Sequence, residues 1–441
     1  MRRLLIFLFL LIFSFNVQAL SLISDEETES YLFDILKPVF KTAGLPLKRD
    51  NIHIVKDSSL NAFVGDKNHM FVHTGTLLKA SNNNEIEGVL AHETGHILGG
   101  HILRLKIKMQ DLQKATLASL IAAAGTAAAS GRGDAAIAVV LGTQSSAINA
   151  MTAYQMSEER AADETAVLLL SKNQKSVKGL KDFMRKIQSN NRLQGIEESP
   201  YFRTHPITAE RISFFSDKLK TEPKLPDEQQ MDERLKRLQA KLLAYLAPLP
   251  KVLSTYPLSD HSVYGKIAHA VYYMRQKNLN MALQYANDLI RLEPQNPYFW
   301  EIKAQALMES GKTKEALVAY KQTLALKPQA DLFKISYAES VLATQPSRKE
   351  MEELIPLLEH VNREQGFPIA YLYLGRIYAD MGQIATADYF AAEYNHAIGE
   401  NDLARKMLHK ALKQPLRSDI KLRAEDLSAK LKQNERKKSL F

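Results

Sequence analysis

The sequence predicts an α+β fold, mainly helical with a small β-sheet, followed by an all-α solenoid of repeated helix pairs. Three observations support this prediction. Apolar residues at Ile86, Val89, Leu90 and Ile97 recur with a helical period. Short stretches at 52–55, 61–64 and 70–74 have the composition and punctuation of strands. Similar segments in the C-terminal part lie 34 residues apart, which is typical of stacked helical repeats.

The N-terminus has the features of a secretory signal. Arg2 and Arg3 precede a short apolar run from Leu4 to Phe13, and small residues lead to a cleavage point after Ala19. The run is shorter than the ~20 residues that span a bilayer, so we expect removal, with an uncleaved anchor as the alternative. The chain has no cysteine, which excludes disulfides and a lipid anchor on cysteine.

Composition allows a globular protein of more than one domain. The 441 residues are 45% hydrophobic and 24% charged, which is ordinary for a packed chain. The net charge of +9 favours anionic surfaces, such as lipid headgroups or acidic clients. No nucleic-acid module accompanies the basic charge, so we expect no nucleic acid as a partner and attribute the charge to scattered lysines.

The first structured segment is expected to be a helix with the apolar stripe Tyr31, Leu32, Ile35, Leu36 and Val39, ended by Gly44. The three strand segments follow. Ser81, Asn82, Asn83 and Asn84 are then candidate N-caps for the next helix.

This next helix carries His92-Glu93-Thr94-Gly95-His96. His92 and His96 are four residues apart and project from one face, a spacing that suits two ligands of Zn²⁺, and Glu93 is placed to take a proton from water. The alternative is a helix with two hydrogen-bonded histidines. A metzincin pattern fails because its third histidine would fall on Ile102, so His101 is expected at the surface or behind the ligands.

A second helical segment, residues 157–164, places Glu159 and Asp163 four apart beside alanines. We expect Glu159 to be the third metal ligand and Asp163 to accept the free ring N–H of a ligating histidine. A solvated acidic face is the alternative. Between the two motifs, Ala115–Ser130 and Ala135–Met151 predict a helical hairpin that packs over the site as a lid, or that makes peripheral membrane contact through 115–151.

His205 is held in a loop by Pro206, which keeps the preceding residue extended. Three roles are open for it: stabilising an oxyanion, approaching the metal as a fourth ligand, or capping the following helix. Arg211 is expected to brace this loop.

Downstream, prolines 223, 226, 248, 250 and 257 bracket a charged helix at 227–246. Pro294 and Pro328, and likewise Ala282 and Ala316, lie 34 residues apart, which is the tetratricopeptide period. Stacked helix pairs of this kind form a concave groove suited to peptides or extended partners.

The HExxH motif at His92, the ExxxD motif at Glu159 and the segment Thr204–Ile212 together resemble the HtpX and CAAX-prenyl-protease type of gluzincin. The resemblance implies a metallopeptidase with one Zn²⁺ per chain on His92, His96 and Glu159. It also implies an edge strand, here Asn61, Ala62 and Phe63, that pairs with the substrate. Glu93 and His205 would be catalytic, and Asp163 and Arg211 would support the ligands.

The expected function is a zinc endopeptidase of the periplasm that acts on unfolded proteins. The resemblance suggests unfolded outer-membrane β-barrel proteins and their assembly machinery as partners. The alternative is a chaperone-like assembly factor that binds clients through its repeats while the metal site stays largely closed. The expected organisation is a signal peptide at 1–19, a zinc metallopeptidase domain at 20–218, a helical linker at 219–260 and a tetratricopeptide domain at 261–441.

Overall fold

The computed structural model of the chain describes residues 20–130, 133–194, 201, 204–225, 229–365 and 367–438. The expected signal peptide at 1–19 lies outside the described residues. The first half contains β1 (Leu22–Ile23), α2 (Glu26–Ala43), β2 (Ile52–Val55), β3 (Ala62–Val64), β4 (Met70–His73), α3 (Thr74–Lys79), α4 (Asn83–Gly99), α5 (His101–Ser130), α6 (Gly133–Lys172), α7 (Lys178–Gln194) and α9 (Ala209–Lys220). The predicted α+β class is confirmed for this half.

The four strands form one sheet in the order β1-β2-β4-β3. β2 and β4 are parallel, whereas β3 is antiparallel to β4, with Ala62 opposite Val72. Alternate residues of β2 and β4 are buried against α2 and α4, including Ile54 and Val72, as the period of two predicts. β3 is therefore an edge strand next to α4.

Helix α4 is the centre of this half and packs against α2, α6, α7 and β3. Two glycines let its neighbours approach closely. A Cβ on Gly88 would lie 2.6 Å from the Leu180 backbone nitrogen, and a Cβ on Gly95 would lie 2.8 Å from the Ala162 carbonyl oxygen. Because α4 is buried on nearly all sides, its residues from Asn83 to His96 show little amphipathic contrast.

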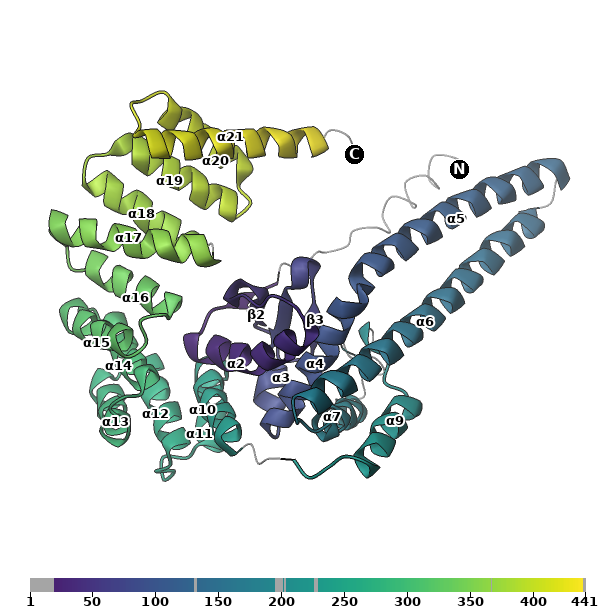
Figure 1. Ribbon diagram of the computed structural model, residues 1–441, viewed down its shortest axis with the longest axis horizontal. Coiled ribbons are helices and arrows are strands. Elements are labelled where there is room, and N and C mark those ends of the chain that lie inside the picture. The colour runs from purple at the N-terminus through teal and green to yellow at the C-terminus, as the bar shows by residue number, and fades with distance from the viewer. Residues whose placement is uncertain are drawn as a thin grey trace.

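Helices α5 and α6 form a long antiparallel hairpin that projects from the body (Figure 1). The sequence predicted the second arm and the Glu159 segment as separate helices, and this was wrong, because α6 runs unbroken through both. The expectation of a lid also fails for the arms, which extend away from the body, with Leu117, Ile121, Leu141 and Ile148 exposed. Among the described residues, no helix has the length and apolar character to cross a membrane.

The segment predicted as a linker contains α10 (Gln229–Leu246) and α11 (Leu249–Thr255). Leu235, Leu238 and Leu242 of α10 belong to the core around the sheet, whereas Ala240 and Ala244 pack with the repeats. Because α10 contributes to both cores, we propose that residues 219–260 form a packed joint rather than a loose connection.

The C-terminal half is an all-α solenoid, as predicted. Its helices are α12 (Val263–Arg275), α13 (Leu279–Leu292), α14 (Pro297–Glu309), α15 (Thr313–Leu326), α16 (Asp331–Leu342), α17 (Arg348–Gln365), α18 (Pro368–Asp380), α19 (Ile384–Ala397), α20 (Asn401–Leu412) and α21 (Ser418–Lys438). The first three pairs begin at Val263, Pro297 and Asp331, at intervals of 34 residues, which confirms the tetratricopeptide period.

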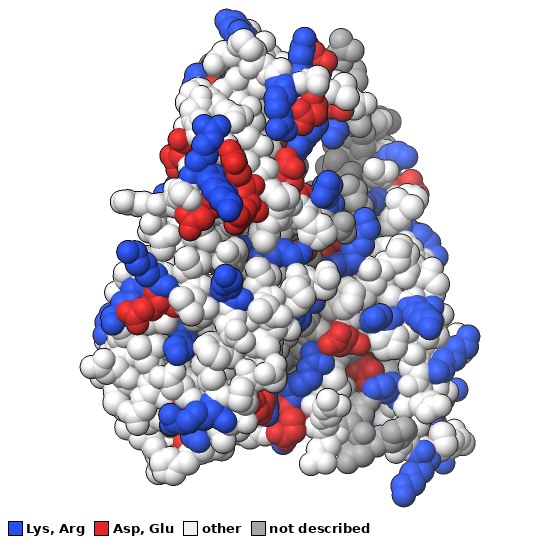
Figure 2. Space-filling model, turned by 60° about the vertical axis from the view of Figure 1, so that its left-hand side comes forward, with Lys and Arg blue, Asp and Glu red and all other residues white. Residues whose placement is uncertain are grey.

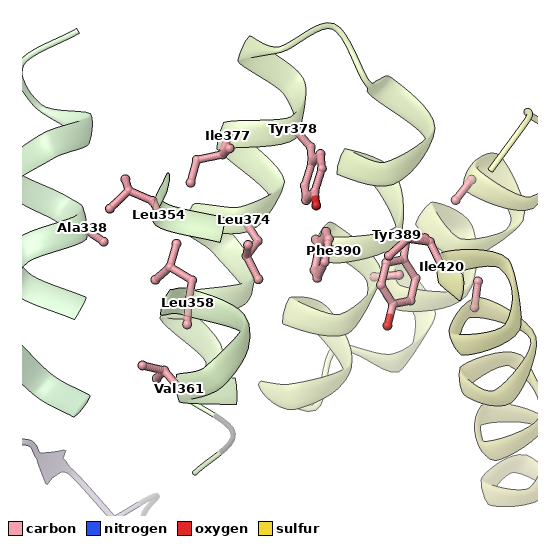
Figure 3. Close-up of a cluster of buried hydrophobic side chains, with 14 of the residues drawn as sticks. Ala338, Leu354, Leu358, Val361, Leu374, Ile377, Tyr378, Tyr389, Phe390 and Ile420 are labelled. Carbon is pink, nitrogen blue, oxygen red and sulfur yellow. The ribbon is translucent and has the colours of Figure 1, made fainter. Parts of the chain in front are cut away.

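Each repeat buries its apolar face against the next. In the last repeats, Leu358, Leu374, Tyr389 and Phe390 belong to one continuous cluster (Figure 3). On the face that Figure 2 presents, Lys and Arg are spread among Asp and Glu rather than gathered in one patch. This distribution agrees with the expectation that the basic charge comes from scattered lysines.

Candidate metal centre

Helix α4 holds His92, Glu93 and His96 in the interior, with exposed fractions of 0%, 0% and 7%. The helix begins where the Asn82 side chain accepts a hydrogen bond from Glu85 N at 3.2 Å. It ends at Gly100, which has φ +62° and caps the last turn. Between these caps the i, i+4 spacing places the two imidazoles together, with their Nε2 atoms 3.1 Å apart.

The close contact of Gly95 with Ala162 brings α6 against α4 at the level of the imidazoles. Glu159 Oε2 lies 3.3 Å from His92 Nε2, and Glu159 Oε1 lies 3.2 Å from His96 Nε2. One turn further along α6, Asp163 Oδ1 lies 2.9 Å from His92 Nδ1. The structure therefore brings the side chains of His92, His96, Glu159 and Asp163 together in one buried cluster.

His205 joins the same cluster from the loop before α9. Its Nδ1 atom lies 2.9 Å from Glu159 Oε1, and its Nε2 atom lies 3.5 Å from Glu93 Oε1. The cap of α9 is Thr208, whose side chain accepts a hydrogen bond from Arg211 N at 3.3 Å. The cap of this helix thus needs no contribution from His205. Instead, His205 belongs to a group of four residues whose possible ligand atoms all lie within 4.8 Å of one another, together with His92, His96 and Glu159.

Arg211 ties these parts together. Its guanidinium donates to Asp163 Oδ2 at 2.6 Å and to the Pro206 carbonyl at 2.8 Å, and its Nη1 atom lies 2.7 Å from Glu159 Oε2. The side chain is 5% exposed. It therefore fixes two carboxylates and the His205 loop at once, as a bidentate fork allows.

A further histidine lies behind the ligands. His101 Nδ1 is 2.6 Å from His96 Nδ1, and His101 Nε2 is 2.8 Å from Glu158 Oε2. The ring folds back over Gly99, where a Cβ would lie 1.9 Å from His101 Nε2. Of the two positions that the sequence left open for His101, the structure selects the one behind His96. The two glycines directly before His101, Gly99 and Gly100, are the feature of the sequence from which this position could have been predicted.

Burial and neighbouring charges shift the protonation of this cluster. Burial lowers the pKa of His92, but its hydrogen bonds to Asp163 and Glu159 outweigh this effect and raise the pKa to about 10. Burial lowers the pKa of His96 to about 3. The pKa of the Glu93 carboxyl is raised, chiefly by burial.

The residues present suit a divalent cation. Three buried carboxylates, Glu93, Glu159 and Asp163, face one buried guanidinium, so a cation would balance the charge. Imidazole nitrogen and carboxylate oxygen are donors that zinc accepts. Neither oxygen of Glu93 has a hydrogen-bond partner among the described residues. This leaves Glu93 free for a group that the protein does not itself provide.

The expected substrate-binding residues lie on the edge strand and just before it. The Asn61 carbonyl accepts a hydrogen bond from His73 N, and Gly65 N donates a hydrogen bond to the His69 carbonyl. Along a strand, the main-chain groups of every second residue point to the same side, so those of Phe63 also point toward β4. The main-chain groups of Ala62 and Val64 therefore point to the free edge. Val64 was not among the residues selected from the sequence.

Comparison with known proteins places these residues in a family. Residues 26–218 match the family model described as Peptidase family M48. A putative beta-barrel assembly-enhancing protease of Vibrio cholerae is 24% identical over 257 residues, covering 56% of this chain and 51% of that protein. A protease HtpX homolog of Pelotomaculum thermopropionicum is 30% identical over 235 residues, covering 49% of this chain and 78% of that protein. Metalloprotease YcaL of Escherichia coli is 32% identical over 170 residues, covering 38% of this chain and 62% of that protein.

This chain spans about half the length of the Vibrio cholerae relative, and more than two thirds of the HtpX homolog. The matched range 26–218 includes α4, the Glu159 turn of α6 and the His205 loop. The resemblance to HtpX-type proteases expected from the sequence is confirmed. The chain belongs to peptidase family M48.

Proposed function

We propose that this protein is a zinc-dependent endopeptidase that cuts unfolded proteins. The observation that carries the proposal is the convergence of His92, His96 and Glu159 from two helices, with the Glu93 carboxylate beside them and without a hydrogen-bond partner in the described part of the chain. A structural metal site would have no need of such a carboxylate. This argument favours catalysis over a purely structural cation.

In this proposal His92, His96 and Glu159 hold one zinc ion per chain. A bound zinc ion would supply Lewis acidity to polarise the scissile carbonyl. Asp163 Oδ1 lies 2.9 Å from His92 Nδ1, so in this proposal it accepts a hydrogen bond from the Nδ1–H group and leaves Nε2 as the ligand atom. His101 contacts Nδ1 of His96 in the corresponding position.

Glu93 takes a proton from the attacking water and delivers it to the leaving amine. Burial raises the pKa of the Glu93 carboxyl above its ordinary value, which makes the carboxylate a stronger base toward the proton of the attacking water. Extended substrate pairs with the free edge of β3 through the main-chain groups of Ala62 and Val64, which holds the scissile bond near α4.

His205 has two roles that fit its contacts. At 3.5 Å from Glu93 Oε1 it is close enough to act on an oxyanion formed beside that carboxylate. Its Nδ1 atom, 2.9 Å from Glu159 Oε1, also lies where a fourth ligand atom would lie. We propose that this arrangement is a closed state, which opens when the loop carrying His205 moves.

The proposed setting is the periplasm, with outer-membrane β-barrel proteins as clients. Its support is the N-terminal signal pattern and the name of the Vibrio cholerae relative, which refers to beta-barrel assembly. The repeats would recruit clients in their concave groove. The alternative, a chaperone-like assembly factor, is favoured by His205 alone, since a permanently closed site would leave binding as the only activity.

Casein hydrolysis by the zinc-loaded protein tests the proposal. Glu93→Gln should retain one zinc per chain and lose activity by roughly 10²–10⁴-fold, because the general base is removed. The matched control is Glu164→Gln on α6, an exposed carboxylate that should change nothing. Full activity in Glu93→Gln would refute the proposed base.

The variant His205→Ala separates the two roles of that residue. Higher casein hydrolysis than in the wild type indicates a closing ligand, and lower hydrolysis with unchanged zinc content indicates oxyanion stabilisation. If neither the wild type nor His205→Ala cuts casein when loaded with zinc, the chaperone-like alternative replaces the protease.

We also propose peripheral contact of the hairpin with anionic lipid. Its support is the exposed aliphatic residues Leu117 and Ile121 on α5, together with lysines near the base of the same helix. Sedimentation with phosphatidylglycerol vesicles should fall for Leu117→Gln/Ile121→Gln and should not change for Val318→Gln, which is 70% exposed on the repeats. Equal sedimentation of both variants would contradict it.

A further inference from the structure

A cavity of about 220 Å³ opens directly beside the ligand cluster. Glu93, His96 and His205 form its polar end. Apolar surface comes from three elements: Phe63 and Val64 of β3, Ile102 and Leu105 of α5, and the ring of Tyr154 of α6. Further polar residues complete the lining: His101, Gln155, Glu158, Glu159 and Thr204. The base of the hairpin therefore forms part of the active-site wall, although its arms extend away.

The position of the cavity relates it to the scissile bond. Glu93, the proposed base, lines the cavity. A substrate side chain that enters the cavity therefore belongs to a residue next to the scissile bond. The free edge of β3 runs past the same place through Val64, whose main chain is open to a pairing strand. Because side chains of a paired strand alternate, one substrate side chain is directed to this side while its neighbours point away.

The chemistry of the walls selects an uncharged side chain. Glu93, Glu158 and Glu159 all line the cavity and would repel a carboxylate. Glu158 is already paired with His101 Nε2 at 2.8 Å and with Arg104 Nη2 at 2.6 Å, so it offers little to a basic side chain. Such a side chain would also lose its hydration against Ile102 and Leu105.

We infer that this cavity is a specificity pocket for a bulky apolar side chain flanking the scissile bond. Ile102 and Leu105, three residues apart on one face of α5, and Tyr154 opposite them set its size. The inference rests on the proposed peptidase function and names the substrate class of that same site: extended segments rich in large aliphatic or aromatic residues.

The test is cleavage of a set of unstructured peptides that differ at one position next to the cut, with Leu, Phe, Ala, Asp or Lys there. The zinc-loaded full chain should prefer Leu and Phe over Ala by about tenfold or more in kcat/KM, and should disfavour Asp and Lys. The set is measured in the wild type and, if the wild type is slow, in His205→Ala.

Two variants at one residue make the pocket larger or smaller. Leu105→Ala should shift the preference toward Phe, and Leu105→Trp should shift it toward Ala, whereas partial unfolding would lower all rates together. The control is Leu103→Ala, on the same helix but 65% exposed. Opposite shifts in the two variants, absent in the control, support the pocket.

Two results overturn the inference and are distinguishable. Cleavage without preference at any position flanking the cut, or preference unaffected by Leu105, removes the pocket and leaves the peptidase intact. Absence of all cleavage in the zinc-loaded wild type and in His205→Ala removes the proposed function, and with it the inference.

Discussion

Two clusters of charged side chains lie in the interior of this protein, and they differ in which atoms lack partners. In the ligand cluster, neither oxygen of Glu93 accepts a hydrogen bond from the described residues. In the joint between the two halves, Lys241 lies 2.5 Å from Asp25, 3.6 Å from Glu27 and 2.8 Å from Glu301. A buried charged group whose atoms lack hydrogen-bond partners indicates a binding site for another molecule or ion. A buried charged group that is fully paired within the chain indicates a role in holding the fold together.

The joint cluster connects elements that are far apart in sequence. Asp25 caps α2, Lys241 is on α10 and Glu301 is on α14. Lys327, just after α15, adds a second contact at 3.0 Å to Glu26. Because Lys241 is only 3% exposed, its charge depends on these carboxylates, and the placement of the repeats against the sheet depends on it.

The largest expected effect is at the joint. Lys241→Met removes the cation that three carboxylates share, and we expect a loss of about 3–5 kcal/mol in the free energy of unfolding, because breaking a buried ion pair leaves uncompensated charge. Urea denaturation measures this loss. Zinc affinity of the folded fraction should not change.

Lys236→Met is the matched control on the same helix. Its ammonium is 51% exposed and pairs with Glu233, and surface ion pairs contribute about 0–1 kcal/mol. If Lys241→Met costs no more than this control, the joint does not hold the two halves together as described.

The next effect concerns the ligand cluster. His101→Asn removes the contact with Nδ1 of His96, and losing such a partner typically weakens metal binding by about 10–100-fold. Titration of zinc against a competing chelator measures the affinity. Unfolding of the metal-free protein should change less than in Lys241→Met. Unchanged zinc affinity would make His101 a packing residue.

A third effect is a pH dependence at the joint. Burial raises the pKa of Glu301 to about 7, against the attraction of Lys241. The folded state then binds more protons than the unfolded state between pH 4.5 and about 7, so this group's contribution to stability is fully present below pH 4.5 and is lost as pH rises to 7. Glu301→Gln should lack that decline.

Urea denaturation of the wild type and Glu301→Gln at several pH values checks the sign. Relative to the wild type, the variant should become more stable as pH rises from 4.5 to 7. A difference that stays constant with pH would show that Glu301 is ionised throughout this range.

Local spacing explains most of what could be predicted from the sequence. His92 and His96, and Glu159 and Asp163, are each four residues apart, and the helical period fixes their common face. The repeat period fixed where α13 and α15 end. The continuity of α6 could not be predicted in this way, because its alanine-rich arm and its Glu159 turn differ in composition while both favour helix.

The sequence by itself determined most of the helices, three of the four strands, the repeat and the pairs of residues that share a face, because these depend on neighbours within a few positions. Tertiary structure alone decided that Val64 rather than Asn61 faces the open edge, and that Lys241 joins α2 to α14. Those features join segments whose separation follows no period, so only the pairing of β3 with β4 and the packing of α10 against both halves bring them about.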